Sequence, residues 1–337
     1  MGRMETNSKG VCGNLFLPSG GRESPCRESM KESHITAIGG VKLDLSSYDG
    51  VDAYSDGPVE EELLDIVKRG DELRAACAPD SSWPIFYHLH PARANILAWY
   101  EFRGSESALE IGAGCGAITG LLAENCRQVT CAEISLRRSQ VNAWRHRHFE
   151  NITIRVGNFA DMTREGRRYD IVTLIGVLEY ARSYYPTAAG DPYAELLTAA
   201  RKCLTPDGVL FVAIENRFGL KYWAGAREDH SARLYDSLEG YPLGAVAETF
   251  SHSGLEALLR QAGLQRLNFH YPYPDYKFAR EIYSDARLPE PGELKDPIHN
   301  YDLERVRNFR EELVFSEIVR AGQFPFFANS FLVAAQI

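Results

Sequence analysis

Short apolar runs alternate with longer stretches of helical periodicity through most of this chain. Continuous or alternating apolar runs of about 4–8 residues predict strands. Seven segments show this pattern: 107–110, 128–133, 152–156, 170–175, 209–215, 264–270 and 330–335. Helical periodicity follows at 118–124 and recurs at 193–203. Strands that alternate with helices predict an α/β fold with a mostly parallel sheet and helices on both faces.

The first third of the chain has a different pattern. Residues 1–46 are rich in Gly, Ser and charge and lack an apolar period, which predicts a flexible extension. Residues 47–104 predict a helical cap, with one helix starting at Pro58 and another following Pro91. The main domain is therefore expected to cover 105–337.

Two insertions interrupt the predicted strands of the main domain. They cover 216–247 and 271–325, and the second contains a predicted helix over about 303–321. Both are rich in aromatic residues and glycine, and long ordered loops in compact domains are often functional. We therefore expect the two insertions to form a lid over a ligand.

A glycine-rich loop follows the first predicted strand. Residues 108–117 read Ala-Leu-Glu-Ile-Gly-Ala-Gly-Cys-Gly-Ala, with Gly112, Gly114 and Gly116 at alternate positions. Glycine allows unusual backbone dihedrals and close ligand approach, and the next helix presents free N–H groups. The loop also satisfies a relaxed dinucleotide fingerprint, so NAD remains an alternative. The acid before it, Glu110, would repel a pyrophosphate and favours a cationic or amine-bearing ligand.

From about 107 to 215 the sequence resembles the class I S-adenosylmethionine (SAM) dependent methyltransferases. Glu110 and the three glycines match their Glu/Asp-x-Gly-x-Gly-x-Gly motif, which holds the methionine part of SAM. The resemblance implies SAM as cofactor. It also implies a Rossmann-like, seven-stranded, mostly parallel sheet with an antiparallel last strand.

Three further positions match cofactor-binding residues of that family. Glu133 ends the second strand, where a carboxylate can accept hydrogen bonds from both ribose hydroxyls. Asn158 stands where the family usually has an aspartate that binds the adenine amine, and its carbonyl can still accept. The resemblance places Phe159 against the adenine ring.

Residues 169–180 resemble the family's fourth strand and the segment after it. They read Tyr-Asp-Ile-Val-Thr-Leu-Ile-Gly-Val-Leu-Glu-Tyr. The resemblance places Ile175 and Gly176 at the cofactor and Glu179 and Tyr180 near the methyl acceptor. A histidine often occupies the position of Tyr180 in the family.

The implied reaction is methyl transfer from SAM to a small molecule, and we expect an oxygen of a sugar, nucleoside or natural product to accept the methyl. A hydroxyl acceptor needs a base, for which His230, Glu179 and Tyr180 are candidates together with Glu215. His230 is favoured because imidazole titrates near neutral pH. The alternatives are a carboxyl or N-methyltransferase, an NAD-dependent oxidoreductase and a non-catalytic SAM-binding subunit.

Composition limits which binding partners and which cellular compartment we expect for this chain. A net charge of −9 over 337 residues argues against non-specific nucleic-acid binding, and no apolar run is long enough to cross a membrane. Seven cysteines without a Cys-x-x-Cys pair fit a reduced, cytoplasmic setting. No metal is expected, because the spaced histidine pairs 88/90 and 146/148 lack a third ligand. A homodimer is left open.

Overall fold

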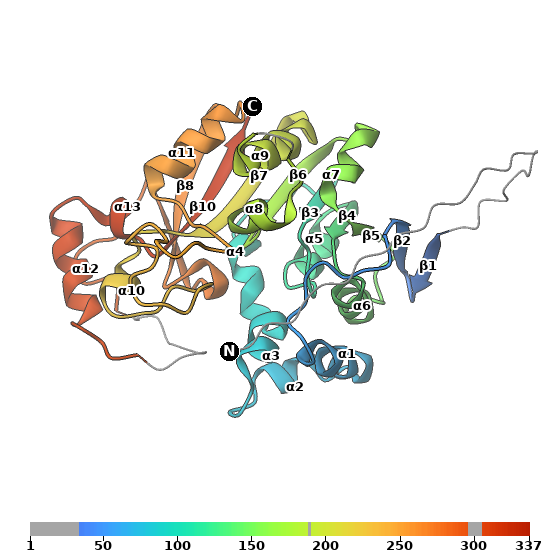
Figure 1. The fold of residues 1–337 in the computed structure, drawn as a ribbon, viewed down its shortest axis with the longest axis horizontal. Helices are drawn as coiled ribbons and strands as arrows, with labels where there is room; N and C mark the ends of the chain where they lie inside the picture. Colours follow the sequence, from blue (N-terminus) through green and yellow to red (C-terminus); the bar gives the residue numbers. More distant parts are fainter. Residues whose placement is uncertain (1–33, 188–189, 296–304) are drawn as a thin grey trace, which may run out of the picture. The chain divides into compact units, whose positions relative to one another are not determined.

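The computed structural model describes residues 34–187, 190–295 and 305–337 (Figure 1). Ten strands of these residues form one mixed sheet in the order β1-β2-β5-β4-β3-β6-β7-β10-β8-β9. The strands are β1 (Ile35–Ile38), β2 (Val41–Ser47), β3 (Ser107–Ile111), β4 (Gln128–Glu133), β5 (Ile152–Gly157), β6 (Tyr169–Ile175), β7 (Leu204–Glu215), β8 (Arg266–Tyr273), β9 (Glu281–Ser284) and β10 (Ser330–Gln336).

The centre of the sheet agrees with the sequence-based prediction. Strands β5, β4, β3, β6 and β7 are parallel neighbours. The last strand, β10, lies antiparallel between β7 and β8, as the family resemblance implies. The strand order reverses on either side of β3, and in open α/β sheets ligands bind outside the carboxyl ends of strands at such a point.

The edges of the sheet correct the predicted strand count. Residues 35–47, which we assigned largely to the flexible extension, form β1 and β2, and β2 pairs in parallel with β5. Val41 and Leu43 are fully buried there. At the opposite edge β9 pairs with β8 inside the second insertion. Strands β1 and β9 have only four residues each, whereas β2 has seven and alternates apolar and polar residues over 41–45, a strand pattern that our prediction overlooked.

Helices cover both faces of the sheet and divide the hydrophobic core into two clusters. Successive side chains of β7 point alternately into one cluster and the other. Leu210, Val212 and Ile214 face one cluster with α9 (Pro192–Lys202) and α11 (His252–Gln261). Phe211 and Ala213 face the other, with α4 (Asn95–Ala98) and α5 (Thr119–Asn125). A strand buried on both faces has the continuous apolar run seen in the sequence.

The helical cap, residues 47–104, consists of short helices. They are α1 (Val59–Arg69), α2 (Glu72–Ala76), α3 (Trp83–Leu89), the 3-10 turn η1 (Pro91–Ala94) and α4. Pro58 precedes α1 as its N-cap residue, and α1 packs against α6 (Leu136–Arg145) through a cluster that includes Leu63 and Val141.

Helices of the two insertions pack against each other, and their role as a lid stays a prediction. The predicted helix at 303–321 corresponds in the described residues to α12 (Glu311–Arg320), which packs against α10 (Leu220–Trp223) and α13 (Phe324–Phe327).

None of the helices in the described part of the chain combines the length and apolar character needed to cross a bilayer.

Candidate active site

A cavity of about 520 Å³ lies at the carboxyl ends of β3, β4 and β6. Its volume falls in the usual range for small-molecule sites, roughly 300–1,000 Å³. Every predicted site residue except Gly116 lines it. The structure thus brings the predicted cofactor residues and the predicted catalytic residues to one cavity.

The three loop glycines have different surroundings. All have positive φ, at +71° for Gly112, +53° for Gly114 and +80° for Gly116. A Cβ at Gly114 would meet nothing closer than 3.5 Å, so this position leaves space toward the cavity. A Cβ at Gly116 would come within 2.4 Å of Asn142 Oδ1 on α6. Gly116 therefore allows the loop to pack against α6 and is not among the residues that line the cavity, and its contact with the cofactor stays a prediction.

The two acids of the cofactor region are buried. Glu110 Oε2 accepts a hydrogen bond from the Thr119 hydroxyl at 2.5 Å, and burial raises the pKa of Glu110 to about 7. Glu133 accepts from the backbone N–H groups of Gly114 (2.7 Å) and Ser135 (3.0 Å). Each carboxylate oxygen has a further lone pair. Glu133 therefore organises the glycine loop and can still accept from a ligand.

Asn158 has a structural role that the sequence did not reveal. Its Oδ1 accepts from Ala160 N at 3.0 Å and caps the short helix α7 (Phe159–Met162). Its Nδ2 donates to the Tyr184 carbonyl at 2.8 Å. An aspartate could make the first bond but not the second, which gives a physical reason for the departure from the family pattern. The neighbouring Phe159 is buried in the cavity wall.

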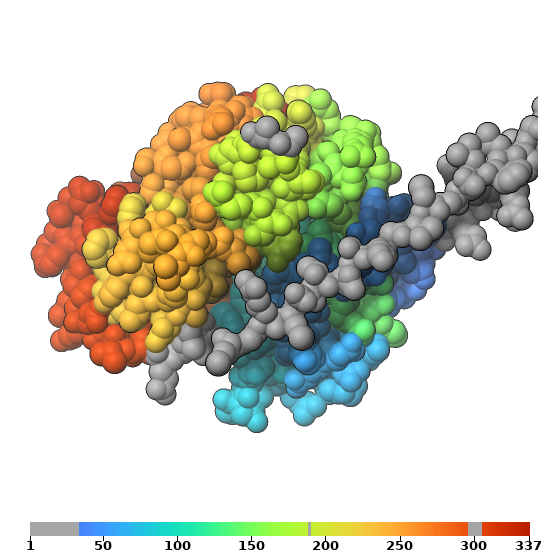
Figure 2. Space-filling model, in the orientation of Figure 1, coloured from blue at the N-terminus to red at the C-terminus, as the bar shows by residue number. Residues whose placement is uncertain are grey.

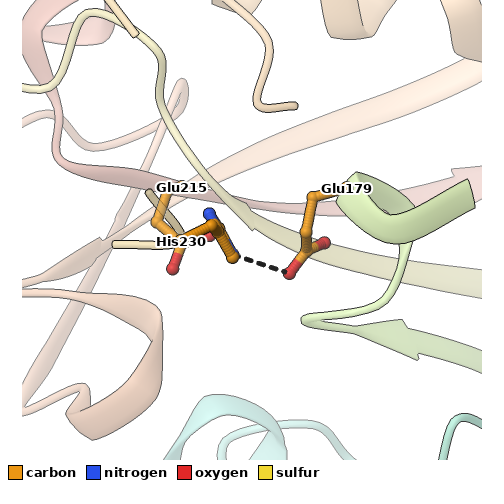
Figure 3. Close-up of side chains that lie close together, drawn as sticks. All are labelled: Glu179, Glu215 and His230. Carbon is orange, nitrogen blue, oxygen red and sulfur yellow. Dashed lines mark ion pairs between the residues drawn. The ribbon is translucent and has the colours of Figure 1, made fainter. Parts of the chain in front are cut away.

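Figure 3 shows three side chains that lie close together: Glu179, Glu215 and His230. Two of them, Glu179 and His230, line the cavity. Glu179 lies in the turn η3 (Leu178–Tyr180), Glu215 ends β7 and His230 lies in the first insertion. One ligand-type atom of each lies within 4.8 Å of the others. Their types would suit a metal ion, but Lys277 already forms an ion pair with Glu215. The expectation of no metal stays a prediction.

His230 lies between two carboxylates. Its Nδ1 is 3.0 Å from Glu228 Oε1, and its Nε2 is 3.8 Å from Glu179 Oε1. Burial alone would lower the pKa of His230, but the contacts with Glu179 and Glu228 and the charge of Glu215 hold it well above its usual value. The imidazole is therefore protonated at neutral pH, contrary to the expectation of a neutral base.

The other two catalytic candidates also have shifted pKa values. Burial, and then the charge of Glu215, raise the pKa of Glu179 against the opposing effect of His230. Burial and the neighbouring Glu179 raise the pKa of Tyr180, whose ring packs edge-on against His230. Both effects favour the neutral phenol, which can donate a hydrogen bond, and a catalytic role for Tyr180 stays a prediction.

A buried network of lysines and acids adjoins His230. Lys277 Nζ lies 2.7 Å from Asp229, and Lys221 Nζ lies 2.9 Å from Asp229 and 2.8 Å from Asp275. With Glu179, Glu215 and Glu228, acids outnumber cations at this end of the cavity. Sequence reasoning missed the two lysines, whose acidic partners lie 48 to 62 positions away or in the same insertion.

The helical cap supplies a wall that the sequence did not predict in detail. Tyr54, Asp56, Trp83, Tyr87, His88 and Arg93 line the cavity. His88 Nε2 lies 2.8 Å from Asp56 Oδ2, and Arg138 of α6 lies 3.4 Å from the same oxygen. No local motif marks these residues, because their role depends on how the cap packs on α6.

Each insertion contributes a small part of the cavity wall. The first provides Asp229 and His230, and the second provides Tyr276 and Lys277. In Figure 2 the gold atoms of the first insertion lie beside the yellow-green atoms of the segment after β6. Ser183 Oγ donates to the Val246 carbonyl there at 2.6 Å.

The first insertion also contains backbone strain. Three residues other than glycine have positive φ: Ala232 (+55°), Tyr235 (+61°) and Tyr241 (+59°). Such conformations persist only where the surrounding structure determines them, and they cluster at functional sites.

Comparison with known protein families finds one match, in the central part of the chain. Residues 109–210 match the model of a methyltransferase domain family. No curated protein matches the chain.

Solved structures include similar SAM-dependent methyltransferases. One from Thermotoga maritima is 14% identical over 82% of this chain and 100% of its own, with a TM-score of 0.42. One from Archaeoglobus fulgidus is 14% identical over 74% of this chain and 94% of its own, with a TM-score of 0.44. Phosphoethanolamine N-methyltransferase 1 of Haemonchus contortus is 15% identical over 82% of this chain and 50% of its own, with a TM-score of 0.45.

The methyltransferase domain begins in β3 and ends in β7, so it contains the glycine loop, Glu133 and the segment after β6. These are the parts of the chain that surround the cavity on the sheet side. The chain contains a methyltransferase domain over residues 109–210, which is consistent with a class I SAM-dependent methyltransferase, and its cofactor is SAM.

Proposed function

We propose that this enzyme methylates an oxygen of a small molecule such as a sugar, a nucleoside or a related natural product. The observation that carries the proposal is the Glu228–His230 pair, in which Glu228 binds Nδ1 while Nε2 points toward Glu179 beside the cavity. A carboxylate that orients a histidine and raises its basicity is a recurrent arrangement for removing a hydroxyl proton.

The residues of the cavity fit SAM on the sheet side. Gly114 leaves room for the methionine part, and Glu110 can attract its amino group. Glu133 would accept hydrogen bonds from the ribose, and Phe159 would lie against the adenine. Ile175 and Gly176, which line the cavity after β6, would contact the same cofactor.

SAM supplies a methyl group on a sulfonium, so the protein need not activate the donor. What the chain contributes is the position of the acceptor oxygen in line behind the methyl carbon, and exclusion of water. When bound, SAM would pass its methyl group to the acceptor oxygen and leave as S-adenosylhomocysteine, while His230 Nε2 would accept the hydroxyl proton of the acceptor. His230 must first lose its own proton, which the raised pKa delays to higher pH.

The cavity lining supports a neutral ring-shaped acceptor. Trp83, Tyr87, Tyr180 and Tyr184 line it. Aromatic faces with polar edges suit sugar rings and nucleosides. The surplus of acids around His230 disfavours a carboxylate acceptor, because like charges repel at close range.

An amine acceptor is the second candidate, and one observation favours it. Glu179 Oε2 and Glu215 Oε2 are buried and have no hydrogen-bond partner among the described residues. Such oxygens are costly unless a donor reaches them. An acceptor ammonium close to this pair would be attracted, and a carboxylate could take its proton before transfer.

Methyl-labelled SAM tests the proposal against a panel of nucleotide sugars, nucleosides, amino sugars and carboxylic acids, with products identified by mass spectrometry. Transfer to an alkali-stable ether supports an oxygen acceptor, whereas an alkali-labile ester indicates a carboxylate. Methylated amino groups would support the second candidate. Binding of S-adenosylhomocysteine without transfer to any acceptor would contradict the proposal and favour a non-catalytic subunit.

A further inference from the structure

We propose that Arg93 of the helical cap binds the carboxylate of the methionine part of SAM. The inference rests on the cofactor placement proposed above and adds a residue outside the matched methyltransferase domain. Arg93 lies in η1, at the junction of the cap and the second insertion, and lines the cavity.

Arg93 is a buried cation whose contacts are with neutral groups. Its side chain is only 4% exposed. One terminal nitrogen donates to the Lys277 carbonyl at 3.1 Å and the other to the Tyr87 hydroxyl at 3.2 Å. The guanidinium also lies 4.2 Å from the centre of the Tyr87 ring. These contacts hold the group in place but do not neutralise its charge.

The guanidinium has unused hydrogen-bonding capacity. An arginine has five N–H donors, and the two contacts above use two of them. Arg93 Nε is buried and has no partner among the described residues. A buried charge is costly unless it is paired and hydrogen-bonded, so this arrangement points to an anion supplied by a ligand.

The other cations that line the cavity already have acidic partners. Arg138 pairs with Asp56 and Glu60, and Lys277 pairs with Glu215 and Asp229. The two histidines have carboxylates within 3.0 Å, Asp56 for His88 and Glu228 for His230. In the described part of the chain, Arg93 is the cavity-lining cation without an ion pair.

The charge distribution in the cavity favours the cofactor as the source of this anion. The acceptor end around His230 already has more acids than cations, which opposes an anionic acceptor there. SAM has both an ammonium and a carboxylate on its methionine part. Glu110 supplies the acid for the ammonium, and Arg93 supplies the complementary cation. A planar guanidinium matches a carboxylate in geometry and charge.

Two ligands separate this role from a structural one. S-adenosylhomocysteine contains the amino-acid end, and 5′-methylthioadenosine lacks it. Calorimetric titration of Arg93→Met should show S-adenosylhomocysteine binding weakened about 10- to 100-fold, as expected for loss of hydrogen bonds to a charged group. Binding of 5′-methylthioadenosine should stay within about twofold of the wild-type value, which also verifies that the variant is folded.

Arg93→Lys keeps the charge but loses the planar fork, and it should fall between the wild type and Arg93→Met. Arg147→Met is the matched control, since Arg147 also donates to backbone carbonyls but lies outside the cavity lining. It should leave both ligands unaffected.

Equal weakening of both ligands would overturn the proposal and make Arg93 a structural residue. Unchanged binding of both ligands, combined with a raised KM for the acceptor, would also overturn it and assign the anion to the acceptor. Absence of methyl transfer by the wild type would contradict the proposed function but leave these binding results valid.

Discussion

At the scale of single residues, the surroundings of His230 determine what it can do. A histidine in water titrates near 6.5, within reach of a general base at neutral pH. Here Glu179, Glu215 and Glu228 outweigh burial and raise its pKa. The residue that the sequence selected as a base is therefore mostly protonated at neutral pH, and it becomes competent only at higher pH.

The rate of methyl transfer should rise with pH above neutrality if His230 takes the acceptor proton, because only the neutral imidazole can accept. His230→Gln should lower kcat about 100-fold and leave S-adenosylhomocysteine affinity unchanged. Glu228→Gln should move the rising limb to lower pH, because it removes a carboxylate that stabilises the imidazolium. The measurement is kcat as a function of pH from neutral into the alkaline range, with His148→Gln as the control outside the cavity lining. A flat profile in the wild type would exclude His230 as the base.

The same shift predicts how His230 affects stability. The raised pKa means that the protonated ring stabilises the folded state, and the contribution is complete below about pH 6.5, the unfolded value. It is lost as pH rises through the higher folded-state pKa. The difference in unfolding free energy between the wild type and His230→Gln, from urea titrations, should therefore shrink toward alkaline pH. A difference that grows with pH would contradict the assigned protonation state.

At the scale of elements, Asn158 joins the start of α7 to the segment after β6. One side chain makes the N-cap bond and the bond to the Tyr184 carbonyl, so it connects two walls of the cavity. The family's usual aspartate would repel that carbonyl.

Asn158→Asp should keep the cap and lose the second bond, lowering the unfolding free energy by about 1–3 kcal/mol. Asn158→Ala loses both bonds and should be at least as destabilised. Ser251→Ala removes the cap of α11 outside the cavity lining and should cost about 0.5–2 kcal/mol without changing ligand affinity. Urea unfolding with and without S-adenosylhomocysteine measures both effects. An Asn158→Asp variant as stable as the wild type would show that the Tyr184 bond contributes nothing.

At the scale of the whole molecule, the cavity wall is assembled from segments that are distant in sequence. The cap, the carboxyl end of the sheet and the tips of both insertions each contribute. A ligand that contacts all of them should link their stabilities, because binding stabilises only the assembled state.

Hydrogen exchange should show this linkage. S-adenosylhomocysteine at about 100 times its Kd should stabilise the fold by about 2.7 kcal/mol. It should slow exchange in the glycine loop (112–118) and in the cap (83–94), with little change in α12, which packs on α10 and α13. Protection confined to the glycine loop would show that the cap takes no part in cofactor binding.

The sequence by itself determined the central strands, the glycine loop and the identity of the cofactor. These features are local: a buried parallel strand has a continuous apolar run, and the loop's backbone requires glycine at alternate positions. The predicted bounds of β4 were correct for the same reason. The four-residue edge strands β1 and β9 escaped prediction because such short strands depend on the neighbour they pair with, whereas the alternating pattern of β2 was overlooked.

Only the tertiary structure decided the orientation of Gly116, the two bonds of Asn158, the protonation of His230 and the unpaired charge of Arg93. Each depends on groups brought close in space from other elements, such as Asn142 beside Gly116 and the Tyr184 carbonyl beside Asn158. Charge interactions and hydrogen bonds act over a few ångströms, whatever the sequence separation. Residue type and spacing could therefore nominate His230, but its surroundings set its pKa, and nothing local distinguished Arg93 from the other arginines of the chain.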